Sequence, residues 1–132
     1  MADVFRYRAG LAVLTVLTLL LLCSACSSSA ASQASVDPAK VDVTVSTDPS
    51  PAPKDKAVKL TGAFTGIELD KSATVSFEVR NGGQSDFVDA EYAGNNSFEA
   101  EYTFKRSGIN EVFVHLYSGD LHAMKKKPVE VK

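Results

Sequence analysis

From residue 40 onward, apolar and polar residues alternate with a period of two, in short runs separated by turn residues. Successive side chains of a strand point to opposite faces, so each run predicts a β-strand with one buried face. About seven such strands, spaced at roughly ten residues, predict an all-β, immunoglobulin-like β-sandwich over residues 40–132. The apolar members of the runs are Val41, Val43 and Val45; Val58 and Leu60; Ala73, Val75, Phe77 and Val79; Val88, Ala90 and Tyr92; Phe98, Ala100, Tyr102 and Phe104; Val112, Val114 and Leu116; and Val129 and Val131.

The residues between the runs agree with this interpretation. Three prolines in the segment 48–53 end the first run, as at a turn or where a chain crosses a sheet edge. Asn81-Gly82-Gly83 and Gly94-Asn95-Asn96 are turn signals. A lysine run, residues 125–127, precedes the last predicted strand. We interpret it as protection against edge-to-edge pairing, the alternative being attraction to an anionic membrane or an acidic partner.

The first 25 residues predict a bacterial lipoprotein signal peptide. Two arginines near the start precede an apolar run over residues 11–22, which is too short to span a bilayer. The small residues Ser24 and Ala25 then precede Cys26, as in a lipobox, although Cys23 stands where leucine is usual. Cys26 is therefore the predicted lipidation site. The alternative is an ordinary secretory signal, cut near Ala25, without a lipid.

Acyl chains such as palmitate on Cys26 would anchor the protein to the membrane at the bacterial cell surface, outside the cytoplasm. Residues 26–39 are rich in Ser and Ala with little apolar bulk, which predicts a flexible tether. We expect a monomer, attached to the membrane through its lipid anchor.

Composition argues against several functions. Fourteen basic and 16 acidic residues leave a net charge of −2, which does not favour a nucleic-acid partner. The predicted domain lacks cysteine, a Gly-rich phosphate loop and a Gly-x-Ser-x-Gly motif, so we predict that it is not an enzyme. One predicted hairpin is acidic, and we interpret its carboxylates as a solvated face rather than a calcium site. These carboxylates belong to Asp86, Asp89, Glu91, Glu99 and Glu101.

The chain's two histidines, His115 and His122, lie within ten residues of its one methionine besides the first residue, Met124. Imidazole suits copper, and a thioether selects soft Cu(I). Because the domain has no thiol, these three side chains are its candidate ligands for Cu(I). The alternative assigns His115 to a half-buried sheet position and Met124 to an edge.

Strand geometry sharpens the metal hypothesis. His122 and Met124 are two residues apart, so in extended backbone they share a face. A two-residue turn at Gly119-Asp120 would place His115 opposite Met124, and all three ligands on one surface. A three-residue turn would shift the register by one residue and separate them.

The C-terminal segment resembles the YtkA-like domain family of bacterial lipoproteins. The resemblance covers residues 40–132, and its most specific part is the spacing of the two histidines with His122-Ala123-Met124. Further similar features are Tyr102-Thr103-Phe104, Ser107-Gly108, Val112 to His115 and Val129-Glu130-Val131; the Pro-rich stretch with Lys54; and Ser76-Phe77-Glu78-Val79 with the Asn81-Gly82 turn.

The resemblance implies an immunoglobulin-like extracytoplasmic domain that handles copper and assists cytochrome oxidase assembly. The expected partner is an exported copper acceptor, such as an oxidase subunit. Family members often have Met-Pro at Met124-Lys125, and extra His or Met where this chain has Phe87 and Tyr92, which implies a weaker, incomplete or shared site. The alternative function, from another class, is a metal-free protein-binding module at the cell surface.

Overall fold

The computed structural model describes residues 36–132. The predicted signal peptide, Cys26 and the tether up to residue 35 lie outside the described residues. Among residues 36–132, no helix is long and apolar enough to cross a membrane.

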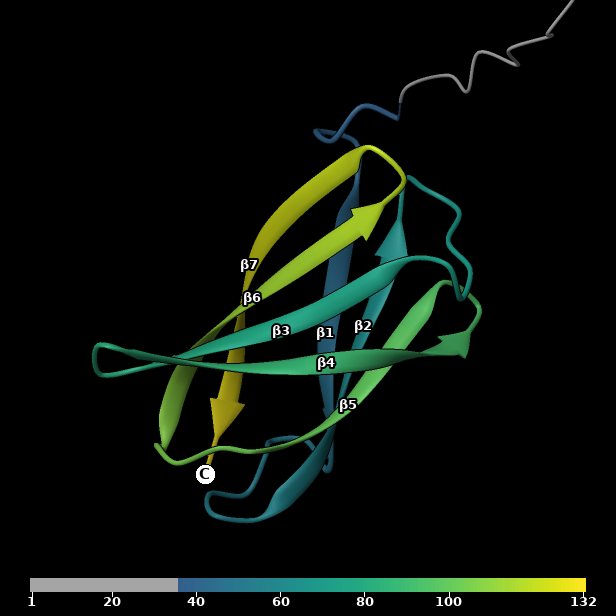
Figure 1. The fold of residues 1–132 in the computed structure, drawn as a ribbon. Helices are drawn as coiled ribbons and strands as arrows, with labels where there is room; N and C mark the ends of the chain where they lie inside the picture. The colour runs from purple at the N-terminus through teal and green to yellow at the C-terminus, as the bar shows by residue number, and fades with distance from the viewer. Residues whose placement is uncertain (1–35) are drawn as a thin grey trace, which may run out of the picture. The chain divides into compact units, whose positions relative to one another are not determined.

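The described chain forms seven strands and no helix, which confirms the predicted all-β fold (Figure 1). Each strand contains most of the run of alternating residues from which it was predicted; Val41, Ala73 and Phe104 lie one residue outside β1, β3 and β5. The strands are β1 (Asp42–Asp48), β2 (Ala57–Thr65), β3 (Thr74–Asn81), β4 (Gln84–Gly94), β5 (Ser97–Thr103), β6 (Gly108–Ser118) and β7 (Leu121–Val131).

All strand pairs are antiparallel, in the order β1-β2-β5-β4-β3-β6-β7. Strand β4 changes partner along its length, because residues 84–90 pair with β3 and its far end pairs with β5. The register shifts between Tyr92 and Gly94 as β4 meets β5. β4 therefore links two layers, β1-β2-β5 and β3-β6-β7, into the sandwich that Figure 1 shows.

The core lies between these layers and contains the apolar residues of the alternating runs. Phe77 of β3 is completely buried, and Phe98 of β5 and Leu60 of β2 are buried with it. Gly62 permits this packing, because a Cβ atom there would approach the Phe77 ring to 3.2 Å. The same strands turn polar side chains outward, which is why the core could be predicted from the period alone.

The proline-rich segment between β1 and β2 reaches the edge of the other layer at β7 before the chain returns to β2. After β1 the chain no longer pairs with β2, and Ala52 forms a parallel bridge with Val131 of β7. The Ala52 amide donates to the Glu130 carbonyl (3.0 Å), and the Lys132 amide donates to the Ala52 carbonyl (2.8 Å). Of the two predicted alternatives, a turn or an edge crossing, the structure shows the edge crossing.

The last strand is longer than the alternation of Val129 and Val131 indicated. β7 begins at Leu121 and contains the lysine run that was expected to precede it. Lys126 turns outward to Glu111 (2.8 Å), while Lys127 reaches Asp42 at the start of β1 (2.9 Å). At an edge strand even the inner face borders solvent, so long lysine side chains fit there without breaking the strand.

We expect truncation of Phe77 to test this core. Phe77→Ala should lower the free energy of unfolding by about 3–5 kcal/mol, because it removes apolar contacts and leaves a cavity. Ile109→Ala, at a side chain that is 68% exposed, should change it by about 0.5 kcal/mol or less. Urea denaturation of both variants measures the difference, and equal effects would contradict the core assignment.

Candidate functional site

The β6–β7 hairpin has the register on which the metal hypothesis depends. Pairing runs without a shift from Gly108–Val131 to Ser118–Leu121, so Gly119 and Asp120 form a two-residue turn. Gly119 has φ of 57°, as the first position of a type II′ hairpin turn requires. His115 therefore lies opposite Met124, and Tyr117 lies opposite His122.

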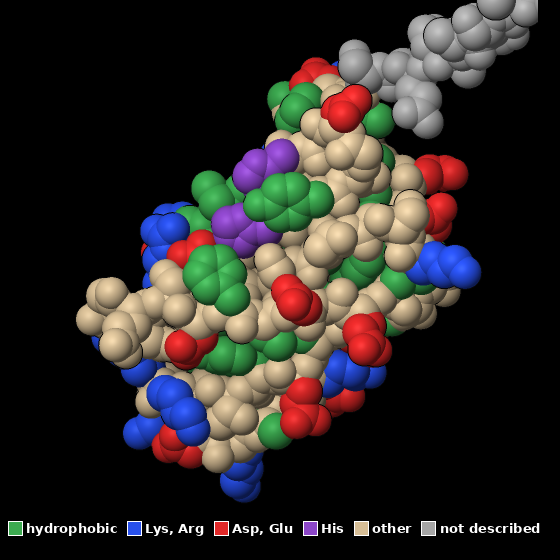
Figure 2. Space-filling view, viewed as in Figure 1, with side chains coloured by type: hydrophobic (Ala, Val, Ile, Leu, Met, Phe, Trp, Pro, Cys, Tyr) green, Lys and Arg blue, Asp and Glu red, His purple; other side chains and the backbone are tan. Residues whose placement is uncertain are grey.

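This register brings His115, His122 and Met124 to one face of the sheet. The residues beside them in sequence, such as Leu116 and Ala123, are buried in the core, so the candidate ligands point away from it. Figure 2 shows both histidines side by side on the outer face, among hydrophobic side chains.

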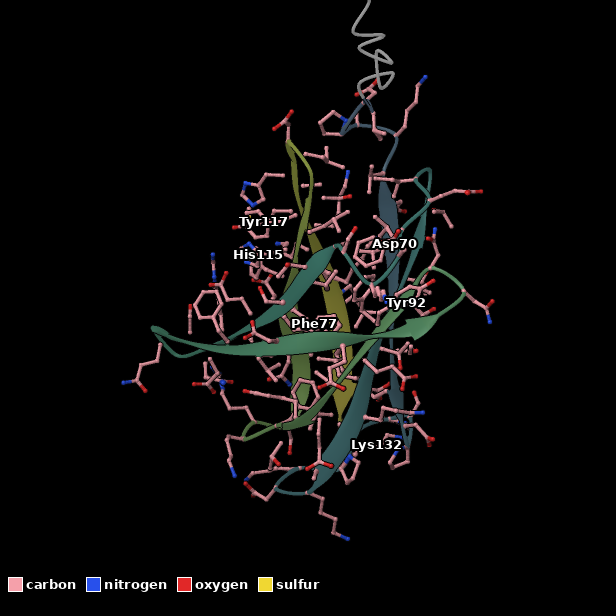
Figure 3. The ribbon with its side chains drawn as sticks, turned by 45° about the vertical axis from the view of Figure 1, so that its right-hand side comes forward. Asp70, Phe77, Tyr92, His115, Tyr117 and Lys132 are labelled. Carbon is pink, nitrogen blue, oxygen red and sulfur yellow. The ribbon has the colours of Figure 1, made fainter. Side chains whose placement is uncertain are left out.

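Aromatic contacts order this face. The Tyr117 and His122 rings stack with centroids 4.3 Å apart and planes 6° apart. The His115 and His122 rings are nearly parallel, with centroids 6.3 Å apart. Phe87 of β4 lies 5.9 Å from His115 on the other side. In Figure 3, His115 and Tyr117 lie together at one side of the molecule, and Phe77 lies at its centre.

A carboxylate supports His115 from the neighbouring strand. Glu78 of β3 accepts hydrogen bonds from Arg80 Nε (2.7 Å) and Ser85 Oγ (2.7 Å), and its Oε2 lies 3.0 Å from His115 Nε2. The Arg80 guanidinium covers the Phe113 ring at 3.9 Å. The side chain of Glu78 is only 6% exposed.

These partners set the charge state of Glu78. The hydrogen bond from Arg80, followed by those from Ser85 and His115, lowers the pKa of Glu78 from 4.5 to about 2. Each bond favours the carboxylate form, so Glu78 is an anion at neutral pH. The outer face thus carries a buried negative charge directly beside a histidine.

The rest of the outer face is unusually apolar for a solvated surface. Phe87 is 64% exposed, Met124 51% and Tyr117 47%. His115 is mostly covered, with 14% of its side chain exposed. The candidate ligands thus include one sheltered imidazole and two accessible groups, the exposed His122 and Met124.

The donor atoms of the candidate ligands limit which metal ions the site could hold. Within residues 36–132, no three His, Cys, Asp or Glu side chains gather so as to hold a metal ion. The hairpin has two imidazoles, and its third donor is the Met124 thioether. Such a set suits a soft ion of low coordination number rather than calcium or magnesium.

The acidic residues of β4 and β5 lie toward β5, although Asp89 shares a register row with Ser76 and His115. Four of them line an open depression of about 370 Å³, together with Lys59 and Ala100. Glu99 there pairs with Lys59 at 3.5 Å, and Asp86 instead accepts from the Tyr102 hydroxyl (2.9 Å). The depression is open to solvent, which agrees with the interpretation as a solvated face. Its four acidic residues are Asp89, Glu91, Glu99 and Glu101.

Sequence reasoning missed Glu78, Arg80 and Ser85. Glu78 appeared as an ordinary outward residue of an alternating strand. Its burial comes from Phe87 and Phe113, which flank it in register from both neighbouring strands. The available signal was aromatic residues on the outward face of the predicted strand over 112–117, since a solvated face seldom carries three rings in alternate positions.

Comparison of the sequence with protein-family models and with curated proteins finds no match.

We expect the Glu78 network to appear in the pH dependence of stability. Because the pKa of Glu78 falls from 4.5 to about 2, its stabilisation is complete above about pH 4.5 and is lost as the pH falls toward 2. Denaturation from pH 6 to 2 should show a shallower loss for Glu78→Gln than for the wild type. Glu111→Gln, which removes a half-exposed carboxylate of the same face, should keep the wild-type slope. Parallel curves for all three proteins would contradict the network.

Proposed function

We propose that this protein is an extracytoplasmic lipoprotein, anchored to the membrane through Cys26, that binds Cu(I) through His115, His122 and Met124. It passes copper to another exported protein, such as an oxidase subunit. The observation that carries the proposal is the register of the β6–β7 hairpin, in which two imidazoles and a thioether share one face.

The chemistry of these groups fits the ion. Cu(I) is soft and accepts thioether and imidazole ligands in low coordination numbers. The His115 and His122 rings are close neighbours, with centroids 6.3 Å apart and nearly parallel planes. An imidazole nitrogen binds a metal in the plane of its ring, so the exposed His122 ring would turn to share an ion with His115. Met124 lies directly across the strand pair from His115. When bound, the ion would join both strands of the hairpin.

Exposure of part of the site suits transfer. His122 and Met124 are open to solvent while His115 is sheltered. An acceptor's ligand can therefore enter the coordination sphere from outside before the last donor leaves. The resemblance of residues 40–132 to YtkA-like domains supports the same function.

The exposed apolar residues favour a second candidate function. Phe87, Tyr117 and Met124 form a cluster on the outer face, and exposed apolar clusters mark protein-binding surfaces. In this alternative the protein is a metal-free binding module at the cell surface, and the histidines serve as aromatic contacts.

Competition for Cu(I) against a chromophoric chelator separates the two functions. The wild type should withdraw copper from the chelator, and the double variant His122→Ala, Met124→Ala should bind more than about tenfold more weakly, a loss of about 1.4 kcal/mol or more. Tyr117→Phe, which keeps the ring stacked on His122, is the matched control and should bind as the wild type does. Equal affinity in the wild type and the double variant would reject the copper site.

Lipidation is tested at the cysteines themselves. Cys26→Ser should abolish the acyl mass in intact-protein mass spectrometry and move the protein from the membrane to the soluble exported fraction, because no acyl chains remain to enter the bilayer. Cys23→Ser is the control and should remain acylated. An unlipidated wild type, cut near Ala25, would favour the ordinary secretory signal.

A further inference from the structure

The contact between Glu78 and His115 determines how this histidine is presented. Glu78 is on β3 and Met124 is on β7, so the two lie on opposite sides of β6. The Nε2 atom of His115 faces Glu78 at 3.0 Å. In an imidazole ring the two nitrogens point in widely different directions, so Nδ1 is turned away from the β3 carboxylate.

The hydrogen bonds of Glu78 determine which nitrogen of His115 carries the proton. The Glu78 carboxylate already accepts from Arg80 and Ser85, and its ion pair with the Arg80 guanidinium keeps it in the acceptor-only form. A short contact between two acceptors would be repulsive. His115 Nε2 must therefore carry the hydrogen, and in a neutral ring the lone pair is then on Nδ1.

The surroundings hold this arrangement in place. Glu78 is 6% exposed and is flanked in register by Phe87 and Phe113. The carboxylate cannot rotate away without breaking its bonds to Arg80 and Ser85. Phe87 lies beside His115 on the same side as Glu78, with ring centroids 5.9 Å apart, and the His122 ring of β7 lies on the other side at 6.3 Å.

We infer that Glu78 is a positioning residue, which fixes His115 as the Nε2–H tautomer and leaves Nδ1 as its only ligand atom. The contribution of Glu78 to Cu(I) binding rests on the proposed function. A carboxylate behind a metal-bound histidine orients the ring and raises its basicity. Glu78 itself makes no bond to the ion. The tautomer, in contrast, is a property of the metal-free protein.

The first test uses the wild-type protein without metal. Long-range ¹H–¹⁵N correlation spectra at mildly alkaline pH distinguish protonated from unprotonated ring nitrogens. We expect His115 to show a protonated Nε2 and an unprotonated Nδ1, with His122 in the same spectrum as the exposed reference. A His115 ring protonated mainly at Nδ1, or an equal mixture of tautomers, would overturn the inference without any substitution.

The second test adds Cu(I) under anaerobic conditions to the same sample. The His115 Nδ1 signal should shift while the Nε2 proton remains bonded to Glu78. A shift at Nε2 with loss of that proton would overturn the inference. If no histidine signal responds and the metal-free tautomer is the expected one, the proposed copper function fails and the positioning role of Glu78 stands.

The third test replaces the carboxylate. The amide of Glu78→Gln can both donate and accept, so it permits either tautomer of His115. We expect a tautomer mixture and Cu(I) affinity about 10–100-fold weaker, whereas Glu111→Gln should leave both unchanged. A single Nε2–H tautomer in a folded Glu78→Gln protein would show that Glu78 does not select it.

Discussion

The register between β6 and β7 is the constraint from which the properties of the outer face follow. A strand has a side-chain period of two, so a shift by one residue would move His122 and Met124 to the inner face and Ala123 to the outer one. The buried side would then have to accept an imidazole and a thioether. Burial of Leu116 and Ala123 and the two-residue turn at Gly119 select the same register, so core packing and turn chemistry together determine where the candidate ligands lie.

Much of the fold could be predicted because each strand buries one face in the core, and this burial requires the alternation of apolar and polar residues that the sequence shows. Every predicted strand is present, since each has one apolar face and turn residues at its ends. The lysines of β7 were placed before the strand because only the alternation of Val129 and Val131 marked it, whereas the strand begins at Leu121. Lys127 lies at the rim and pairs with Asp42 on β1, a long-range contact that a local pattern does not contain.

In the candidate site, too, the residues close in sequence could be predicted and the distant ones could not. His115, His122 and Met124 lie on one hairpin, so their arrangement depends on the length of a single turn. The sequence could therefore predict that they share a face if that turn has two residues. Glu78 is 37 residues from His115 in the chain and reaches it only because β3 pairs with β6. Neither strand order nor register between distant strands is readable from a period of two. The supporting residues of a site are therefore harder to predict than its ligands.

The Glu78 network is better explained by orientation than by stability. The partners of Glu78 favour its charged form over the neutral one, but a well-packed apolar residue in place of a buried ion pair would often serve stability equally well. An apolar residue there would, however, leave the His115 ring free to turn and to hold its proton on either nitrogen. The face around it is otherwise built of rings that restrict rotation without choosing a tautomer. Among the residues of the described part, 36–132, that contact His115, Glu78 is the one whose chemistry distinguishes the two ring nitrogens. This links a buried charge on β3 to the direction in which the β6–β7 hairpin presents a ligand.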